Sequence, residues 1–213
     1  MYRLIIFIGI FSWGYNARHL STGYRTFGFQ VSDTTCFNLT NEDIFEAAKY
    51  GNKTRMEFIL GCNVTDLNSI DSDGKTPLYV ATENDNKDAV RLLLARPDVD
   101  VNKGATVGNR AGASALYIAA LYDNVGMVEL LIGHPKTDVN KGRTHDALNA
   151  LMSAAWDGFT ELVKMLLSHP RIDVNKQRQS DGATPLFLAA RYGTEAGITY
   201  IWKLIKVIYV KSF

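Results

Sequence analysis

Internal repetition limits which folds this chain can adopt. Residues 97–103 read Pro-Asp-Val-Asp-Val-Asn-Lys, and close copies of this segment recur at 135–141 and 170–176. A weaker copy, Thr-Asp-Leu-Asn, occupies residues 65–68. Self-similarity at a fixed period indicates a repeat architecture, in which each unit packs mainly on its neighbours.

A second motif recurs with the same spacing as the first. It is a triplet that reads Thr-Pro-Leu or a variant of it and starts at positions 76, 114, 149 and 184, which lie 38, 35 and 35 residues apart. The Asp-Val-Asn segments start at Asp100, Asp138 and Asp173, which lie 38 and 35 residues apart. In both motifs the first spacing is three residues longer than the next. The same three-residue insertion therefore explains both, and it must lie between Lys103 and Ala113.

Each unit predicts two helices joined by a turn. A hydroxyl such as that of Thr76 can cap free backbone amides, and proline is tolerated in the first turn of a helix. Paired small residues follow, as at 119–120, and let two helices approach closely. A second helix carries apolar residues at helical spacing around Leu131. The His-Pro pair at 134–135 then ends this helix, because proline disfavours helical geometry in the residue before it.

This turn followed by two helices, with Thr-Pro-Leu, Ala-Ala, Leu-Leu and Val-Asn at matching offsets, resembles the ankyrin repeat. The resemblance implies an all-α repeat solenoid, in which each unit has a β-hairpin or turn and two antiparallel helices. It covers about residues 41–195, with units near 41–70, 71–108, 109–143 and 144–178 and a partial unit at 179–195. The first unit lacks Thr-Pro-Leu and is typical of a capping repeat.

The chain departs from the family at one position of the first helix. Where ankyrin repeats often carry a histidine after Thr-Pro-Leu, this sequence has Tyr79, Tyr117, Met152 and Phe187. This predicts that apolar packing replaces a hydrogen bond of the family.

Composition narrows the classes of function. The 23 Lys and Arg residues nearly cancel the 22 Asp and Glu residues, so the chain lacks the positive field that draws proteins onto nucleic acid. The sequence contains no Gly-rich phosphate loop, His-Glu-x-x-His motif or nucleophile elbow. His134 and His169 recur at repeat spacing, which indicates structure, because a catalytic site needs different residues meeting in one place. We therefore expect no enzyme, cofactor or metal site.

The sequence contains two cysteines, Cys36 and Cys62. They are too few for a disulfide scaffold and lack the clustered His or Cys partners of a zinc site. We expect two buried or free thiols.

The two ends fall outside the repeats. Within the N-terminal segment 1–40, residues 1–32 lack Asp and Glu and include an apolar run, as in a signal or organelle-targeting peptide; disorder is the alternative. N-glycosylation sequons start at Asn38, Asn52 and Asn63 and also point to secretion. A cytoplasmic location is nevertheless favoured, because most ankyrin arrays work in the cytosol or nucleus. Residues 196–213 predict an atypical C-terminal helix or cap.

The resemblance implies a protein-binding module. Ankyrin proteins bind partners on a continuous concave face formed by hairpin tips and first helices. By this analogy, the candidate partner-binding residues are Glu83, Asn84, Arg110, Leu121, Tyr122, His145, Asp146, Trp156, Asp157, Arg191 and Tyr192, with Lys49 and Tyr50 at equivalent positions of the first unit. Trp156 and Tyr122 stand out, because aromatic residues dominate binding energy at interfaces. Packing on the neighbouring unit is the alternative interpretation of Trp156 and of the tyrosines.

Two other interpretations stay open. In one, the chain is a truncated fragment of a larger ankyrin-repeat protein whose effector domain is absent. In the other, it is a secreted or membrane-associated ankyrin binding protein. In each case we expect one or more unidentified protein partners, no nucleic acid, no membrane contact in the favoured case, and a monomer.

Overall fold

The computed structural model describes residue 36, residues 39–62 and 65–192, and residues 199 and 206. Within these residues the chain consists of helices and loops and contains no β-strand. The helical repeat solenoid expected from the sequence is therefore confirmed, although its turns form no strand. The expected targeting segment and most of the C-terminal cap lie outside the described residues.

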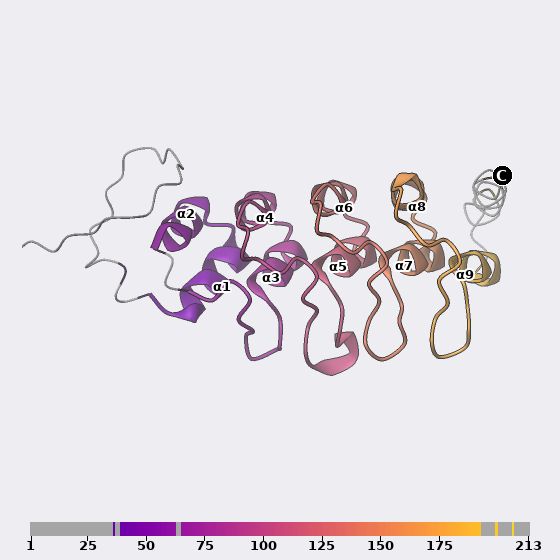
Figure 1. Cartoon of the computed structure of the whole chain (residues 1–213), viewed down its shortest axis with the longest axis horizontal. Coiled ribbons are helices and arrows are strands. Elements are labelled where there is room, and N and C mark those ends of the chain that lie inside the picture. The colour runs from indigo at the N-terminus through magenta and orange to yellow at the C-terminus, as the bar shows by residue number, and fades with distance from the viewer. Residues whose placement is uncertain (1–35, 37–38, 63–64, 193–198, 200–205, 207–213) are drawn as a thin grey trace, which may run out of the picture. The chain divides into compact units, whose positions relative to one another are not determined.

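The helices form two rows, with loops projecting beyond one of them (Figure 1). The inner row contains α1 (Asn41–Tyr50), α3 (Pro77–Glu83), α5 (Ala115–Leu121), α7 (Ala150–Asp157) and α9 (Pro185–Tyr192). The outer row contains α2 (Lys53–Cys62), α4 (Lys87–Leu94), α6 (Val125–Ile132) and α8 (Thr160–Ser168). We call the projecting loops fingers: residues 71–75, 103–113, 143–148 and 178–183, the second of which contains the 3₁₀ helix η2 (Gly108–Arg110).

The first residue of each triplet caps an inner helix, as the sequence predicts. The side-chain oxygens of Thr76, Ser114, Asn149 and Thr184 accept hydrogen bonds from the backbone N–H groups three residues on, at 3.2, 3.4, 2.9 and 3.2 Å. Such bonds satisfy donors that the first turn of a helix leaves free. The repeated triplet is therefore a repeated helix start.

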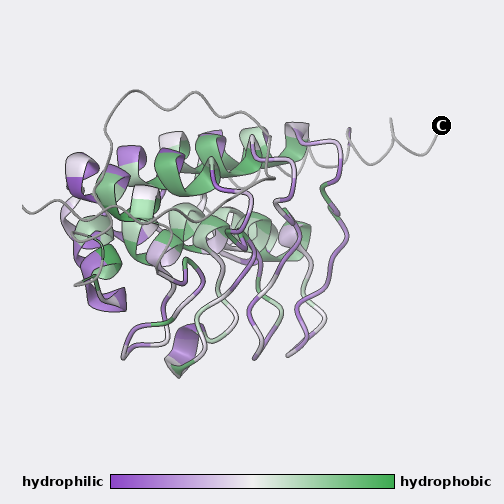
Figure 2. Ribbon diagram, turned by 60° about the vertical axis from the view of Figure 1, so that its left-hand side comes forward, coloured by the Kyte–Doolittle hydropathy of each residue, from purple (hydrophilic) through white to green (hydrophobic). Residues whose placement is uncertain are grey.

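The hydrophobic core lies between the two rows. Leu78, Leu93, Leu131 and Leu151 are among the fully buried side chains, and Figure 2 shows that hydrophobic residues concentrate on the helices while the fingers are mainly hydrophilic. From α1 to α7, every inner helix packs on its own outer helix and on the next inner helix. A helix pair therefore completes its core only against its neighbours.

Most of the residues that replace the family histidine pack as expected. Tyr79, Tyr117 and Met152 are buried. Phe187 is 47% exposed, so the expectation of apolar packing is wrong at this position.

The Asp-Val-Asn segments form clamps between consecutive repeats. Asn68, Asn102 and Asn140 each accept a hydrogen bond at Oδ1, from the backbone N–H of Asp100, Asp138 and Asp173 respectively, all at 2.7 Å. Through Nδ2 the same asparagines donate to the carbonyls of Asp98, Lys136 and Arg171, at 2.7 to 2.8 Å. We call each such pair of bonds an asparagine clamp. The recurring sequence is thus explained by a recurring contact.

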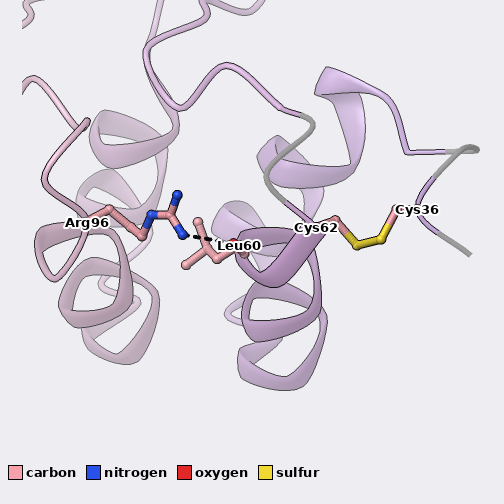
Figure 3. Close-up of a disulfide and its surroundings, with 4 residues drawn as sticks. All are labelled: Cys36, Leu60, Cys62 and Arg96. Atoms are coloured by element: carbon pink, nitrogen blue, oxygen red, sulfur yellow. Dashed lines mark hydrogen bonds between the residues drawn. A yellow bond between two sulfur atoms is a disulfide. The ribbon is translucent and has the colours of Figure 1, made fainter. Parts of the chain in front are cut away.

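Cys36 and Cys62 form a disulfide (Figure 3). Their Cα atoms lie 5.7 Å apart, within the usual range for bonded cysteines. The expectation of two buried or free thiols is therefore wrong. Because α1 and α2 are antiparallel, the segment before α1 lies beside the end of α2, which the spacing of two cysteines alone does not reveal. The bond closes the first helix pair into a covalent loop.

The asparagine clamp predicts a position-specific loss of stability. Asn102→Ala removes two hydrogen bonds to the next repeat and should lower the free energy of unfolding by about 1–2 kcal/mol. Urea unfolding followed by circular dichroism measures the change. Asn175→Ala is the matched control, because the amide group of Asn175 donates to no acceptor among the described residues. Equal losses in the two variants would contradict the clamp.

The disulfide should stabilise the first helix pair through the unfolded chain. For a sequence separation of 26 residues, loop-closure entropy predicts a contribution of about 3 kcal/mol. Reduction should therefore speed amide hydrogen exchange in α1 and α2 more than in α7. A chain with both Cys36→Ser and Cys62→Ser is the control and should not respond to the reductant. Unchanged exchange in α1 and α2 after reduction would show that the bond carries no stability.

Candidate functional site

The fingers lie side by side and are joined by single backbone hydrogen bonds. Thr106 N–H donates to the carbonyl of Gly74 at 2.9 Å, Thr144 N–H to Ala111 at 2.9 Å, and Gln179 N–H to Asp146 at 2.7 Å. The fingers and the exposed sides of α1, α3, α5, α7 and α9 together make one surface, which we call the finger face. It contains the positions that the sequence identified as candidate binding residues.

Glycine allows the two sides of a finger to approach closely where the finger begins. A Cβ atom on Gly104 would lie 2.4 Å from the backbone of Gly112, and one on Gly142 would lie 2.2 Å from the carbonyl oxygen of Ala147. Neither backbone can give way as a flexible side chain could. The two sides of these fingers therefore approach more closely than any residue with a side chain allows.

Cations at the fingers lie over aromatic rings of the inner helices. The distances from the cationic group to the ring centroid are 5.6 Å for Lys75 and Tyr79, 5.5 Å for Arg110 and Tyr122, 5.5 Å for Arg143 and Tyr117, and 5.0 Å for Arg178 and Trp156. Contacts within about 6 Å of a ring are attractive. Each finger is thus attached to an adjacent inner helix. We call these four cation–ring pairs the finger anchors.

Each anchor cation also contacts a carboxylate. The Glu83 carboxylate lies 2.7 Å from Lys75 Nζ and 3.4 Å from Arg110 Nη1. Arg143 pairs with Asp146, and Arg178 with Asp181, inside their own fingers. The anchors therefore add little net positive charge to the finger face.

The two carboxylates that pair with an arginine inside their own finger, Asp146 and Asp181, are held in their charged form. Burial raises the pKa of Asp146, but hydrogen bonds from Arg143 and from the backbone of Leu148 outweigh it, so the net pKa is lowered. The hydrogen bond from Arg178 lowers the pKa of Asp181 to about 2. Both ion pairs are therefore intact at neutral pH.

Trp156 and Tyr122, which stand out in the sequence, both contribute to this surface. Trp156 is half-buried and stacks on Tyr192 of the next unit, with ring centroids 4.2 Å apart and an interplanar angle of 15°. Tyr122 is 50% exposed, and its hydroxyl accepts a hydrogen bond from Arg110 at 3.0 Å. The packing interpretation and the surface interpretation thus both apply to Trp156, whereas Tyr122 is mainly a surface residue.

The other candidate residues divide by exposure. Asn84, His145, Asp157, Arg191 and Tyr192 are exposed, Glu83 and Arg110 are partly buried in the ion pairs, and Leu121 packs under the surface. Asp146 is buried, with 6% exposure, and accepts from Leu148 N–H at 3.1 Å. Its carboxylate therefore holds its own finger together and is not free for a partner.

Sequence reasoning missed a hollow between the capping repeat and the next unit. It has a volume of about 480 Å³ and is lined by Asn41, Glu42, Phe45, Glu46, Lys49, Tyr50, Ile70, Asp71, Ser72 and Val80. Two of its apolar side chains are well exposed, Tyr50 at 71% and Ile70 at 46%. Lys49 and Tyr50 were detectable because they follow a pair of alanines, as Tyr122 does. Ile70 precedes the first finger and carries no repeat signal.

The histidines that recur in the sequence occupy equivalent positions of consecutive repeats. His134 and His169 follow the outer helices α6 and α8, and burial, together with the charge of Lys136 and of Arg171 respectively, lowers the pKa of each. In the part of the chain that the structure describes, no three His, Cys, Asp or Glu side chains gather to hold a metal ion. Among the same residues, no helix is both long and apolar enough to cross a membrane.

Comparison with known proteins agrees with this architecture. A family model described as ankyrin repeats (three copies) matches residues 44–143 and 116–207. The chain is 36% identical over 70 residues to a transient-receptor-potential-like protein of Caenorhabditis elegans, a match that covers 32% of this chain and 7% of that protein. It is similar in fold to the crystal structure of the ankyrin repeat protein EF0377, with a TM-score of 0.67 and 24% identity over 80% of this chain and 83% of the other. The chain belongs to the ankyrin-repeat family.

Proposed function

We propose that this chain binds a partner protein on its finger face. Ankyrin repeats are generally protein-interaction modules, and the family match covers most of the chain. The observation that carries the proposal is the group of exposed aromatic side chains on one surface: Tyr50, Tyr122 and Tyr192 are 71%, 50% and 40% exposed. Exposed aromatic residues on a monomer commonly mark an interaction site.

The finger anchors support this function by fixing the surface in advance. Arg110 holds Tyr122 both by a hydrogen bond and by lying over its ring. Tyr192 is held against Trp156 by stacking. Side chains that are already ordered lose less conformational entropy on binding, so more of the contact energy appears as affinity.

Two areas of the finger face differ in chemistry. The central area, around Tyr122 and Trp156, presents aromatic rings beside arginines whose charges are paired. The hollow of the capping repeat combines Tyr50 and Ile70 with acidic side chains that include Glu42 and Glu46. The hollow suits an apolar side chain flanked by basic residues, whereas the central area suits a flat aromatic or aliphatic contact.

A second role fits the partial match to a much larger protein. The transient-receptor-potential-like protein is matched over only 7% of its length. In this alternative the repeats are the interaction segment of a longer chain, and effector activity resides elsewhere. The finger face has the same task in both cases, and we expect neither catalysis nor a cofactor from the repeats. We also expect the repeats to be monomeric.

The finger face can be tested by substitution at exposed aromatic residues. A tagged full chain should capture a partner from source cells, and Tyr122→Ala should weaken that binding by about tenfold or more, as loss of an interface hot spot does. Tyr50→Ala examines the hollow separately. Affinity is measured by calorimetry with the identified partner.

Arg91→Ala on α4 is the matched control, because Arg91 is exposed on the outer row and pairs only weakly with Asp88 at 3.3 Å. Circular dichroism should show unchanged helical content in all three variants. A partner that binds all three as tightly as the original chain would refute the finger face as its site.

A further inference from the structure

The capping repeat combines a disulfide with an exposed glycosylation sequon. We propose that Asn52 carries an N-linked glycan, and that the chain folds in the oxidising, glycosylating compartment in which the Cys36–Cys62 disulfide forms. The proposal concerns the capping repeat only and does not depend on whether the finger face binds a partner.

The disulfide indicates the compartment. Cytosolic proteins rarely keep structural disulfides, because glutathione and thioredoxin hold their thiols reduced, whereas the secretory lumen and the cell exterior preserve them. Cys36 and Cys62 are bonded in the structure, and no free cysteine remains in the described part of the chain. This weighs against the cytoplasmic location that the family resemblance favours.

Asn52 is placed for modification. It lies in the turn between α1 and α2 within the sequon Asn52-Lys53-Thr54, and all three residues are exposed. Its Oδ1 accepts a hydrogen bond from the backbone N–H of Arg55 at 2.9 Å, which caps α2. Its Nδ2 donates to no acceptor among the described residues. The atom that would bear the glycan is therefore free, while the cap uses the other atom.

The chemistry requires two co-reactants of the secretory pathway. In the first reaction, Asn52 Nδ2 attacks the anomeric carbon of a lipid-linked oligosaccharide pyrophosphate. The N–C bond forms, the C–O bond to the pyrophosphate breaks, and the amide releases one proton. In the second, the two thiols lose two electrons and two protons to a disulfide-bearing oxidoreductase, which becomes a dithiol.

Asn52 lies in the turn that follows the C-terminal end of α1. The turn after α1 lies beside the turn after α3, because Asn86 Nδ2 donates to the carbonyls of Ala48 and Lys49 at 2.6 and 2.8 Å. The fingers enter the inner helices at the opposite end. A helix of 10 residues such as α1 is about 15 Å long. A glycan on Asn52 therefore lies at the end of the inner row opposite to where the fingers enter, and two residues from Tyr50, so it borders the hollow of the capping repeat.

The test uses the full chain with its own N-terminus, produced in animal cells and recovered by a C-terminal tag. Amidase release in heavy-oxygen water converts a glycosylated asparagine to a labelled aspartate, and peptide mapping then identifies the site. A parallel map without reductant, after rapid alkylation, reports whether Cys36 and Cys62 are joined. We expect label at Asn52 and a linked Cys36–Cys62 peptide.

Paired variants isolate this sequon from those at Asn38 and Asn63. Thr54→Ala destroys the sequon but keeps the Asn52 cap, so the denatured chain should lose one glycan in electrophoresis. Thr54→Ser keeps the sequon and should migrate like the original chain. Unlabelled Asn52, or Cys36 and Cys62 recovered as alkylated free thiols, would overturn the proposal. Neither result would bear on binding at the finger face.

Discussion

The dependence of each helix pair on its neighbour underlies the whole structure. In a pair such as α5 and α6, the two helices bury part of their apolar surface against each other and part against the helices of the next unit. The asparagine clamps add a polar contact in the same direction: Asn102 of one repeat holds the backbone of Asp138 in the following repeat. Hydrophobic burial favours stacking but tolerates sliding, whereas two hydrogen bonds with fixed partners set the register.

The repeated elements were predictable because a recurring residue serves a recurring contact. Thr76 and Ser114 cap helices at the same point of each unit, and the asparagines clamp at the same point. Features that occur once were not predictable. The disulfide joins residues that only the antiparallel return of α2 brings together, and Ile70 gains its role from the hollow around it.

Whether a candidate residue faces solvent or bonds within the protein was not predictable for a similar reason. The sequence identifies Asp146 as a candidate binding residue, but a carboxylate in a finger either faces solvent or bonds to its own loop. Arg143, three residues earlier, pairs with Asp146 and so keeps its carboxylate inside the finger. The sequence allows both packing and binding for Trp156, and in the structure the ring of Tyr192 covers one side of Trp156 while leaving it half-buried. Such outcomes depend on neighbours in space that a single sequence does not identify.

The small number of hydrogen bonds between fingers has a mechanical consequence. The helices of consecutive repeats share a continuous apolar core, whereas consecutive fingers share one or two hydrogen bonds, such as those from Thr144 N–H to Ala111 and from Arg143 to Asn109. The array is thus stiff along its helices and compliant along its fingers. Bending should therefore open or close the spacing of the fingers while the core acts as a spine, so that the curvature of the surface can adapt to a ligand without any repeat unfolding.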